Sequence, residues 1–500
     1  MLLRLVRPAL AVFLAVCLLA AAGCSTAKPH KAAGALALTG WQQVLGEIGP
    51  QGTVSAATAL RAFALAFGPL PGVRVPSDPA GQIRSGSVAI RWIVGHWAEI
   101  TADQRAAAVA LVPELGNVAA RTHKRVMPAD YAAPKRPPTF YTVLAMQMAD
   151  EIEAHVHVPL TLKLRAAEGR TQQAKALADT GVYNAAGGTT GTADKCVITV
   201  SATGAAEQII DLEDTIGHEV WHCYQGQVIG MDAYYNPATP SWIIEGQAEW
   251  VGDSLRPIAD AASPWHPYVT LPGTSLFKRS YDAIGFYSHL TESGVDTWLS
   301  LIPMLQETGG NEARYAKAGA TSDVFLDTWA STYFRESSYG PAWLMNGPGL
   351  PSTRGPVRLV LSVANGGGKN FKAPAYANAV YSLSSQADVL TFTVTGHARL
   401  GDPAEHADYV LSSGDSFCTK DGGCTCPEGS TYQGPKLKAL PPESALAVSG
   451  GPEGSNGSAA GQSLDDFCNK PTPDTKLALP DPCKIVTQAD ASKAAGRPAR

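Results

Sequence analysis

The segment His218-Glu219-Val220-Trp221-His222 constrains this chain more than any other stretch, because it places two histidines four residues apart around a glutamate. On a helix this spacing puts both imidazoles on one face, about one turn apart, where they can hold a single zinc ion. The glutamate then lies beside the metal and can take a proton from zinc-bound water. The motif therefore predicts a helix with a metal at its face.

The pattern H-E-x-x-H can also occur by chance. The chain has 11 histidines, and at that frequency the pattern would arise in about one of a hundred chains of this length. Zinc needs a third protein ligand and an open fourth position. The motif is therefore informative only if another part of the sequence supplies that ligand.

A second helix is predicted from Ser241, the expected N-cap, to Pro257, and it carries Glu245 and Glu249 one turn apart. Two carboxylates on one helix face usually point to solvent. Here their neighbours are mostly apolar, which is unusual for a solvated face: Trp242, Ile243, Ile244, Ala248 and Trp250. Residues 223 to 244, 22 in all, separate this helix from His222 and are enough to turn the chain.

The two segments together resemble the gluzincin group of zinc metallopeptidases, in which H-E-x-x-H is followed by a W-x-x-E-G-x-A-E segment. The resemblance covers roughly residues 140 to 335. It implies that His218, His222 and Glu245 are the zinc ligands, that Glu219 is the general base, and that Glu249 orients one ligand histidine. The implied fold class is α+β, with a zincin-like metallopeptidase domain, a mainly α-helical lobe and a small β-rich C-terminal domain.

A tyrosine is a further candidate for the catalytic site. In some gluzincins a tyrosine on a Y-x-x-G helix donates a hydrogen bond to the oxyanion of the tetrahedral intermediate. Tyr281 and Gly285 have one more residue between them, so the spacing here is Y-x-x-x-G. Tyr281 is therefore a candidate for this hydrogen-bond donor, and a role in packing is an equally favoured alternative. Tyr287 and His289 are less favoured candidates for the same donor.

The first 24 residues have the pattern of an export signal. Arg4 and Arg7 precede an apolar stretch too short for a comfortable membrane span. The run A-A-G-C ending at Cys24 resembles the lipobox of bacterial lipoproteins, with Ala21 where leucine is usual. This resemblance implies a lipid on Cys24 that anchors the chain to the outer face of the cell membrane. The alternative is an ordinary cleaved signal peptide, and both place the protein outside the cytoplasm.

The cysteines also favour an oxidising compartment. Nine are present, and seven remain once Cys17 and Cys24 are assigned to the N-terminal segment. Cys196 is expected to pair with Cys223. Two further disulfides and one free thiol are expected among the five C-terminal cysteines, whose connectivity stays open: Cys418, Cys424, Cys426, Cys468 and Cys483. The C-x5-C-x-C spacing that begins at Cys418 fits no usual zinc site, so disulfides are favoured there.

Composition shifts predict the domain order. A lipoprotein signal peptide (1–24) and a tether (25–40) precede the zincin-like domain (41–345). That domain divides into a helical region (41–155), a catalytic core (156–260) and a helical lobe (261–345). A β-rich domain (353–435), expected to be a sandwich, and a cysteine-containing flexible tail (436–500) follow.

Two local predictions depend on this division. Residues 158–164 and 196–200 alternate as strands do, and the second is expected to be an edge strand beside the metal. Residues 449–461, rich in glycine and serine, are expected to be a flexible linker. The helical region 41–155 contains no motif that indicates chemistry.

These features predict zinc-dependent hydrolysis of peptide bonds by a membrane-anchored extracellular metallopeptidase that acts on a peptide or protein. No G-x-M-E-N-like amine-anchoring motif precedes the zinc helix, which favours an endopeptidase. A net charge of −5 with 17% charged residues gives no basis for a nucleic-acid partner. The alternative is a catalytically lapsed surface lipoprotein that serves as a binding or scaffold module, but such a protein would not need Glu219.

Overall fold

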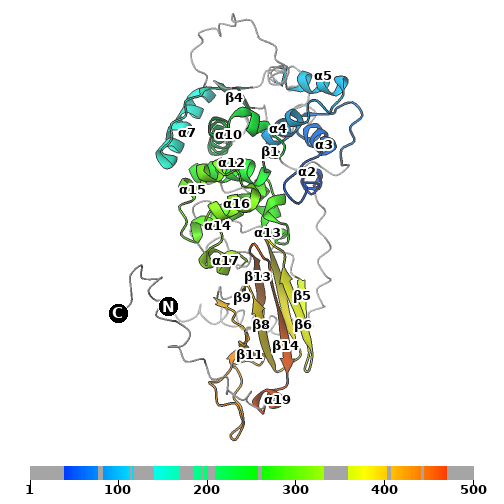
Figure 1. Cartoon of the computed structure of the whole chain (residues 1–500), viewed down its shortest axis with the longest axis vertical. Coiled ribbons are helices and arrows are strands. Elements are labelled where there is room, and N and C mark those ends of the chain that lie inside the picture. Colours follow the sequence, from blue (N-terminus) through cyan, green and yellow to red (C-terminus); the bar gives the residue numbers. More distant parts are fainter. Residues whose placement is uncertain are drawn as a thin grey trace, which may run out of the picture. The chain divides into compact units, whose positions relative to one another are not determined.

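The computed structural model describes residues 39–76, 83–112, 115–116, 140–168, 185–192, 195–200, 209–256, 262–330, 359–402, 407–440 and 444–469. In these residues helices and one small sheet are followed by two larger sheets (Figure 1). The prediction of a mixed α+β protein is confirmed. Cys24 and the rest of the predicted signal peptide lie outside the described residues. Among the described helices, none combines the length and the apolar composition that a membrane span requires.

The N-terminal helices begin where the sequence supplies caps. The Ser55 hydroxyl accepts a hydrogen bond from the Thr58 amide at 3.1 Å, and the Thr101 and Gln104 side chains form a capping box. Their buried faces join one large core that continues into the later helices. The helices of this region are α2 (Gly40–Leu45), α3 (Ala56–Phe67), α4 (Ser87–Gly95), α5 (Ala102–Leu111) and α7 (Phe140–Val156).

A four-stranded sheet has the order β1-β3-β4-β2. Its strands are β1 (Ile83–Ser85), β2 (Lys163–Glu168), β3 (Ala185–Thr192) and β4 (Lys195–Val200). The strand predicted at 196–200 is present as β4, but the prediction that it is an edge strand is wrong, because β4 lies between β3 and β2. The short strand β1 pairs with the other side of β3 and forms one edge of the sheet, and β2 forms the other.

The strand predicted at 158–164 is also displaced and starts only at Lys163. The reason is a side chain of helix α10 (Ile209–Ile229). Gln227 accepts a hydrogen bond from the Thr161 amide at 2.7 Å and donates one to the Pro159 carbonyl at 2.8 Å. These backbone groups are therefore bonded to a helix rather than to a neighbouring strand.

Helices α10 (Ile209–Ile229) and α12 (Ser241–Leu255) pack against each other, and the short helix α11 (Met231–Tyr235) lies in their connection. Gly252 permits the close approach, because a Cβ atom there would lie 2.8 Å from the Asp214 carbonyl oxygen. The N-cap of α12 is Pro240 rather than the predicted Ser241. The Ser241 hydroxyl instead accepts a hydrogen bond from Arg91 at 2.7 Å.

The chain then forms further helices with a shared aromatic core. Phe286, Phe325 and Trp329 are in mutual ring contact there. All of these helices lie within residues 261–345, where a helical lobe is predicted. The elements are α13 (Ala262–Thr270), η1 (Leu276–Lys278), η2 (Tyr281–Ala283), α14 (Ile284–Glu292), α15 (Thr297–Gln306), α16 (Gly310–Lys317) and α17 (Asp323–Trp329).

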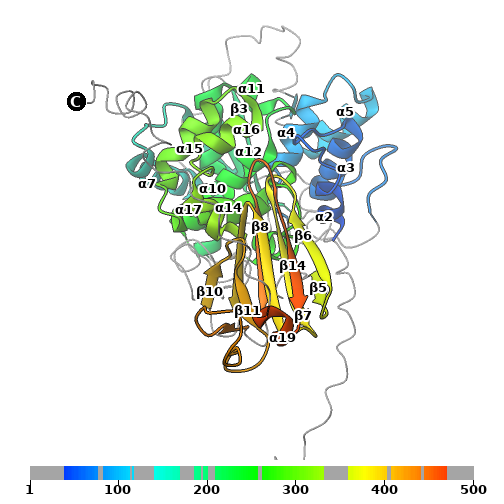
Figure 2. The same ribbon diagram turned by 60° about the horizontal axis from the view of Figure 1, so that its bottom comes forward.

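The C-terminal strands form two five-stranded sheets whose apolar residues share one core, as in the expected sandwich. One sheet has the order β10-β9-β13-β7-β5: β10 (Ala407–Val410), β9 (His397–Asp402), β13 (Ala445–Gly450), β7 (Ala377–Ser385) and β5 (Leu359–Val363). The other has the order β12-β11-β8-β14-β6: β12 (Lys438–Ala439), β11 (Ser416–Cys418), β8 (Val389–Thr395), β14 (Ser455–Gln462) and β6 (Gly368–Ala373). In Figure 2, β14 lies between β8 and β6, as this order requires.

The linker predicted at 449–461 is wrong, and so is the flexible tail predicted from residue 436 as far as residue 469; residues 470–500 lie outside the described part of the chain. Strands β13 and β14 cover most of residues 445–462 and are inner strands of the two sheets, and helix α19 (Leu464–Cys468) follows. Small residues are required there by packing. A Cβ atom on Gly457 would lie 2.3 Å from the Thr393 carbonyl oxygen and 2.4 Å from the Phe371 ring. Glycine therefore marks close approach of side chains and strands rather than flexibility.

Three disulfides occur in the described residues: Cys196–Cys223, Cys418–Cys424 and Cys426–Cys468. The first joins strand β4 to helix α10, as predicted. The other two confirm that the C-terminal cysteines form disulfides. Cys483 lies outside the described residues.

Candidate metal centre

Helix α10 carries three of the predicted site residues, His218, Glu219 and His222, in its buried part. The Nε2 atoms of the two histidines are 3.1 Å apart, and their ring centroids are 4.8 Å apart. The separation of four residues on a helix therefore brings both imidazoles to one point.

Helix α12 brings Glu245 to the same point. Its Oε2 atom lies 3.3 Å from the Nε2 atom of His222 and 3.7 Å from that of His218. Atoms bound at roughly 2.0–2.1 Å to one tetrahedral ion would be about 3.3 Å from one another. These residues thus have the spacing of ligands around one ion, and in the described part of the chain they are the group that could hold a metal.

The environment of Glu245 also fits a bound cation. The side chain is fully buried, and neither carboxylate oxygen has a hydrogen-bond partner among the described residues. Burial would raise the pKa of this carboxyl, but the imidazoles of His222 and His218 and the guanidinium of Arg91 lower it below its usual value. A buried anion is costly unless it is compensated by nearby charge. A divalent metal would supply that charge at the oxygen atoms.

The other ring nitrogen of each histidine is held by a second side chain. Glu249 has an oxygen 3.0 Å from Nδ1 of His218, and the Gln225 side-chain oxygen lies 2.7 Å from Nδ1 of His222. Acceptors at Nδ1 favour the tautomer in which Nε2 is available to a metal. Glu249 lies where the sequence places it, whereas Gln225 was not predicted.

His218 lies among carboxylates that favour a positive charge. Burial alone would lower the pKa of its imidazole, but the neighbouring carboxylates of Glu245 and Glu249 outweigh burial and raise the pKa to about 10. A metal ion held by the three ligands would satisfy the same preference and would displace the proton.

Glu219 lies beside these ligands and does not belong to the metal group. Its Oε2 atom accepts a hydrogen bond from the Ser87 hydroxyl at 2.8 Å, and both side chains are buried. Ser87 is the first residue of helix α4 and stands 132 residues earlier in the chain. The helical region without any recognisable motif therefore contributes directly to the site.

Arg91, one turn further along α4, lies near Glu245. Its guanidinium donates hydrogen bonds to the Thr239 carbonyl and the Ser241 hydroxyl, each at 2.7 Å, and its Nε atom is 3.9 Å from Glu245. Burial lowers the pKa of Arg91 although Glu245 acts in the opposite direction. Arg91 therefore joins α4 to the start of α12 and adds positive charge next to the metal group.

Tyr281 lies next to His218, a member of the metal group. Its ring stacks on His218 with centroids 5.8 Å apart, and it lies in the short helical turn η2, which leads directly into α14. The other two candidates are engaged elsewhere. The Tyr287 hydroxyl donates to a backbone carbonyl of α12 at 3.1 Å, and the His289 ring contacts the Phe325 carbonyl at 3.1 Å.

Tyr234 is a further tyrosine at the site, and it was not predicted from the sequence. Its ring centroid is 5.7 Å from that of His222. The side chain is fully buried, and its hydroxyl has no hydrogen-bond partner among the described residues. Burial, followed by the charge of Glu245, raises the pKa of the phenol well above its ordinary value. Tyr234 therefore stays protonated and offers a donor close to the ligands.

The chain matches no family model, no curated protein and no solved structure. The assignment of a function therefore depends on the chemistry of the residues themselves. That chemistry consists of a three-residue metal group, a separate buried carboxylate held by Ser87, and a buried phenol.

Proposed function

We propose that the protein is a gluzincin-type zinc peptidase with a zincin-like fold, exported and anchored to the outer face of the cell membrane through a lipid on Cys24. The observation that carries the proposal is the convergence of His218, His222 and Glu245 beside a buried carboxylate, Glu219, that is outside the metal group. A site that only stored a metal would not need this second buried anion.

Each residue has a separate task in this proposal. His218, His222 and Glu245 hold the zinc ion, which supplies a Lewis acid and activates water at neutral pH. Glu219 accepts a proton as water attacks the peptide carbonyl and gives it to the leaving amine. The hydroxyl of Tyr234, or that of Tyr281, donates a hydrogen bond to the carbonyl oxygen as negative charge develops on it.

Ser87 acts on the proposed reaction through Glu219. Its hydroxyl holds one oxygen of the carboxylate, so the base is already oriented when a substrate arrives. The ligands and the base are each at most 4% exposed. These side chains are therefore largely shielded from bulk water.

The test is a metal analysis of the mature chain, followed by digestion of a mixed peptide library read by mass spectrometry. We expect about one zinc ion per chain and cleavage at internal peptide bonds. A chelator should abolish cleavage and added zinc should restore it. A chain that holds zinc but cleaves no peptide would refute the proposal and favour a binding module.

Ser87→Ala tests the contact between α4 and the base. We expect kcat to fall by about tenfold, because a hydrogen bond to a charged group is worth roughly 1.5 kcal/mol, while zinc content stays at the wild-type level. In a Glu219→Gln background the same substitution should have little further effect. Loss of zinc, or an equal fall in both backgrounds, would contradict a role through Glu219.

A further inference from the structure

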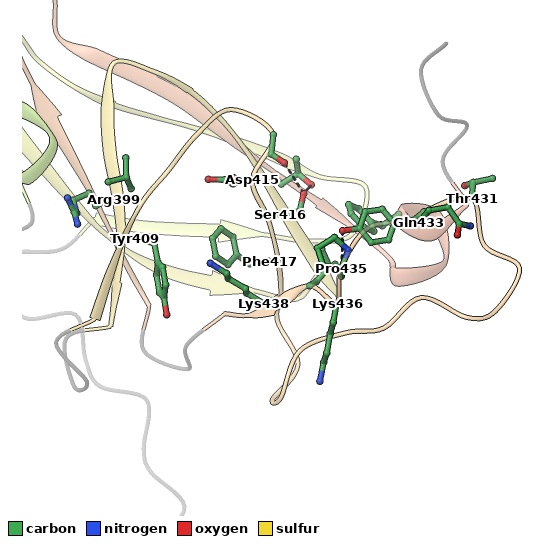
Figure 3. A pocket seen from close by; sticks show the side chains of 16 residues that line it. Arg399, Tyr409, Asp415, Ser416, Phe417, Thr431, Gln433, Pro435, Lys436 and Lys438 are labelled. Atoms are coloured by element: carbon green, nitrogen blue, oxygen red, sulfur yellow. Dashed lines mark hydrogen bonds between the residues drawn. The ribbon is translucent and has the colours of Figure 1, made fainter. Parts of the chain in front are cut away.

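A pocket of about 1090 Å³ lies in the β-rich domain (Figure 3). Residues of β10 and of β12 both line it, and these are the last strands of the two sheets. Within the described residues, no further strand pairs with the outer edge of either one. The pocket therefore lies at an open side of the sandwich.

The register of the strands shows why this side is open. Tyr409 pairs with Leu400, and Leu400 pairs with Leu446. Paired residues share one face of a sheet, and both leucines are fully buried in the core of the sandwich. Tyr409 thus faces inward and is nevertheless 40% exposed. The opposite sheet does not cover it, since β12 has only 2 residues.

The pocket has an excess of free positive charge. Lys436 and Lys438 line it, both are exposed, and neither forms an ion pair with a described carboxylate. The Lys438 ammonium lies 5.1 Å from the centroid of the Tyr409 ring (Figure 3). Asp415, the carboxylate of the lining, already accepts a hydrogen bond from the Ser412 amide at 2.7 Å. This local charge is opposite in sign to the net charge of −5 of the whole chain.

We propose that this pocket binds an extended, acidic segment of another protein, which adds as a strand along β10. A free sheet edge presents backbone N–H and C=O groups with which such a segment can pair. Its carboxylates would meet Lys436 and Lys438, and alternate side chains would pack on the exposed ring of Tyr409. The site is separate from the metal centre, and its occupation does not require peptide hydrolysis.

The free edge of β10 favours a peptide over other anions. Lysines and a tyrosine ring could also hold an acidic polysaccharide through charge and stacking. An extended peptide uses, in addition, the backbone groups along the 4 residues of β10, because its own groups repeat with the same spacing. The test must therefore distinguish binding of an acidic polysaccharide from binding of an acidic peptide.

The test measures binding of a short fluorescein-labelled peptide of alternating glutamate and valine to the full chain by fluorescence anisotropy. Glu219→Gln is present throughout, so that the probe is not cleaved. We expect binding that weakens with salt and is about tenfold weaker in Lys436→Glu/Lys438→Glu. The matched control, Lys369→Glu/Lys372→Glu, reverses two exposed lysines of β6 and should leave the affinity unchanged.

A second probe tests the pairing of backbones. The same peptide methylated on alternate backbone nitrogens keeps its charge but loses donors, and it should bind about tenfold more weakly. The proposal is overturned if the acidic peptide does not bind, if the two double variants bind it equally, or if methylation has no effect. Tighter binding of polyglucuronate than of the peptide would also overturn it. Circular dichroism and thermal melting check that both double variants are folded.

Discussion

Glu219→Gln is expected to lower kcat for peptide hydrolysis by about a thousandfold, the range of general acid–base catalysis, while zinc content stays unchanged. The amide has the shape of the carboxylate but cannot accept the proton. The three ligand side chains are untouched by the change, because Glu219 lies outside the metal group. Zinc is measured by elemental analysis, and kcat with an internally quenched peptide.

The matched control is Glu213→Gln on the same helix. This carboxylate is 24% exposed and pairs with Arg256, away from the metal group. The same chemical change there should alter kcat by less than about twofold, since a partly exposed ion pair outside the metal group contributes little to it. Activity retained in Glu219→Gln would show that Glu219 is not the base, and zinc lost from it would place Glu219 among the ligands.

Glu245→Ala is expected to remove the metal and, with it, the activity. Zinc sites built from protein ligands bind with roughly 10–16 kcal/mol. Loss of one of three ligands should therefore cost on the order of 4 kcal/mol, or about a thousandfold in affinity. Calorimetric zinc titration measures the affinity. Thermal melting of the metal-free protein reports separately on stability, because Arg91 loses its neighbouring carboxylate.

Two variants distinguish the loss of a metal ligand from the loss of side-chain packing and from a change in the orientation of His218. Glu245→Gln preserves the volume of the side chain and should lose zinc as Glu245→Ala does. Glu249→Gln changes only the partner of the His218 Nδ1 atom, so zinc affinity should fall by about 10- to 100-fold. Full zinc occupancy in both Glu245 variants would remove this residue from the ligands.

The parts of the site that depend on local geometry were predictable. Two histidines four residues apart must share a face if the segment is helical, and apolar neighbours of Glu245 indicate that its helix is buried. Both helices are present, as α10 and α12, and their carboxylates and imidazoles meet. A disulfide between Cys196 and Cys223 was likewise expected from the compartment and is present.

Other parts were misread because composition does not report contacts. The glycine- and serine-rich stretch near residue 457 has the composition of a linker, yet it forms an inner strand, since bulkier side chains would collide with neighbouring strands. Strand β4 was expected at a sheet edge. Its place inside the sheet depends on β3, which pairs with one side of β4 while β2 pairs with the other. Strand β3 consists of alanine, glycine and threonine and has no alternation of apolar and polar residues, so it leaves no strand signal.

The sequence by itself determined which residues can ligate a metal and which carboxylate stands between the two histidines, because the spacing along one helix depends only on neighbouring residues. Only the tertiary structure decided that Ser87 holds Glu219, that Arg91 lies near Glu245, and that Tyr234 lies beside His222. A single serine, arginine or tyrosine carries no pattern of its own. Its role is set by the packing of segments far apart in the chain, such as the 132 residues that separate Ser87 from Glu219.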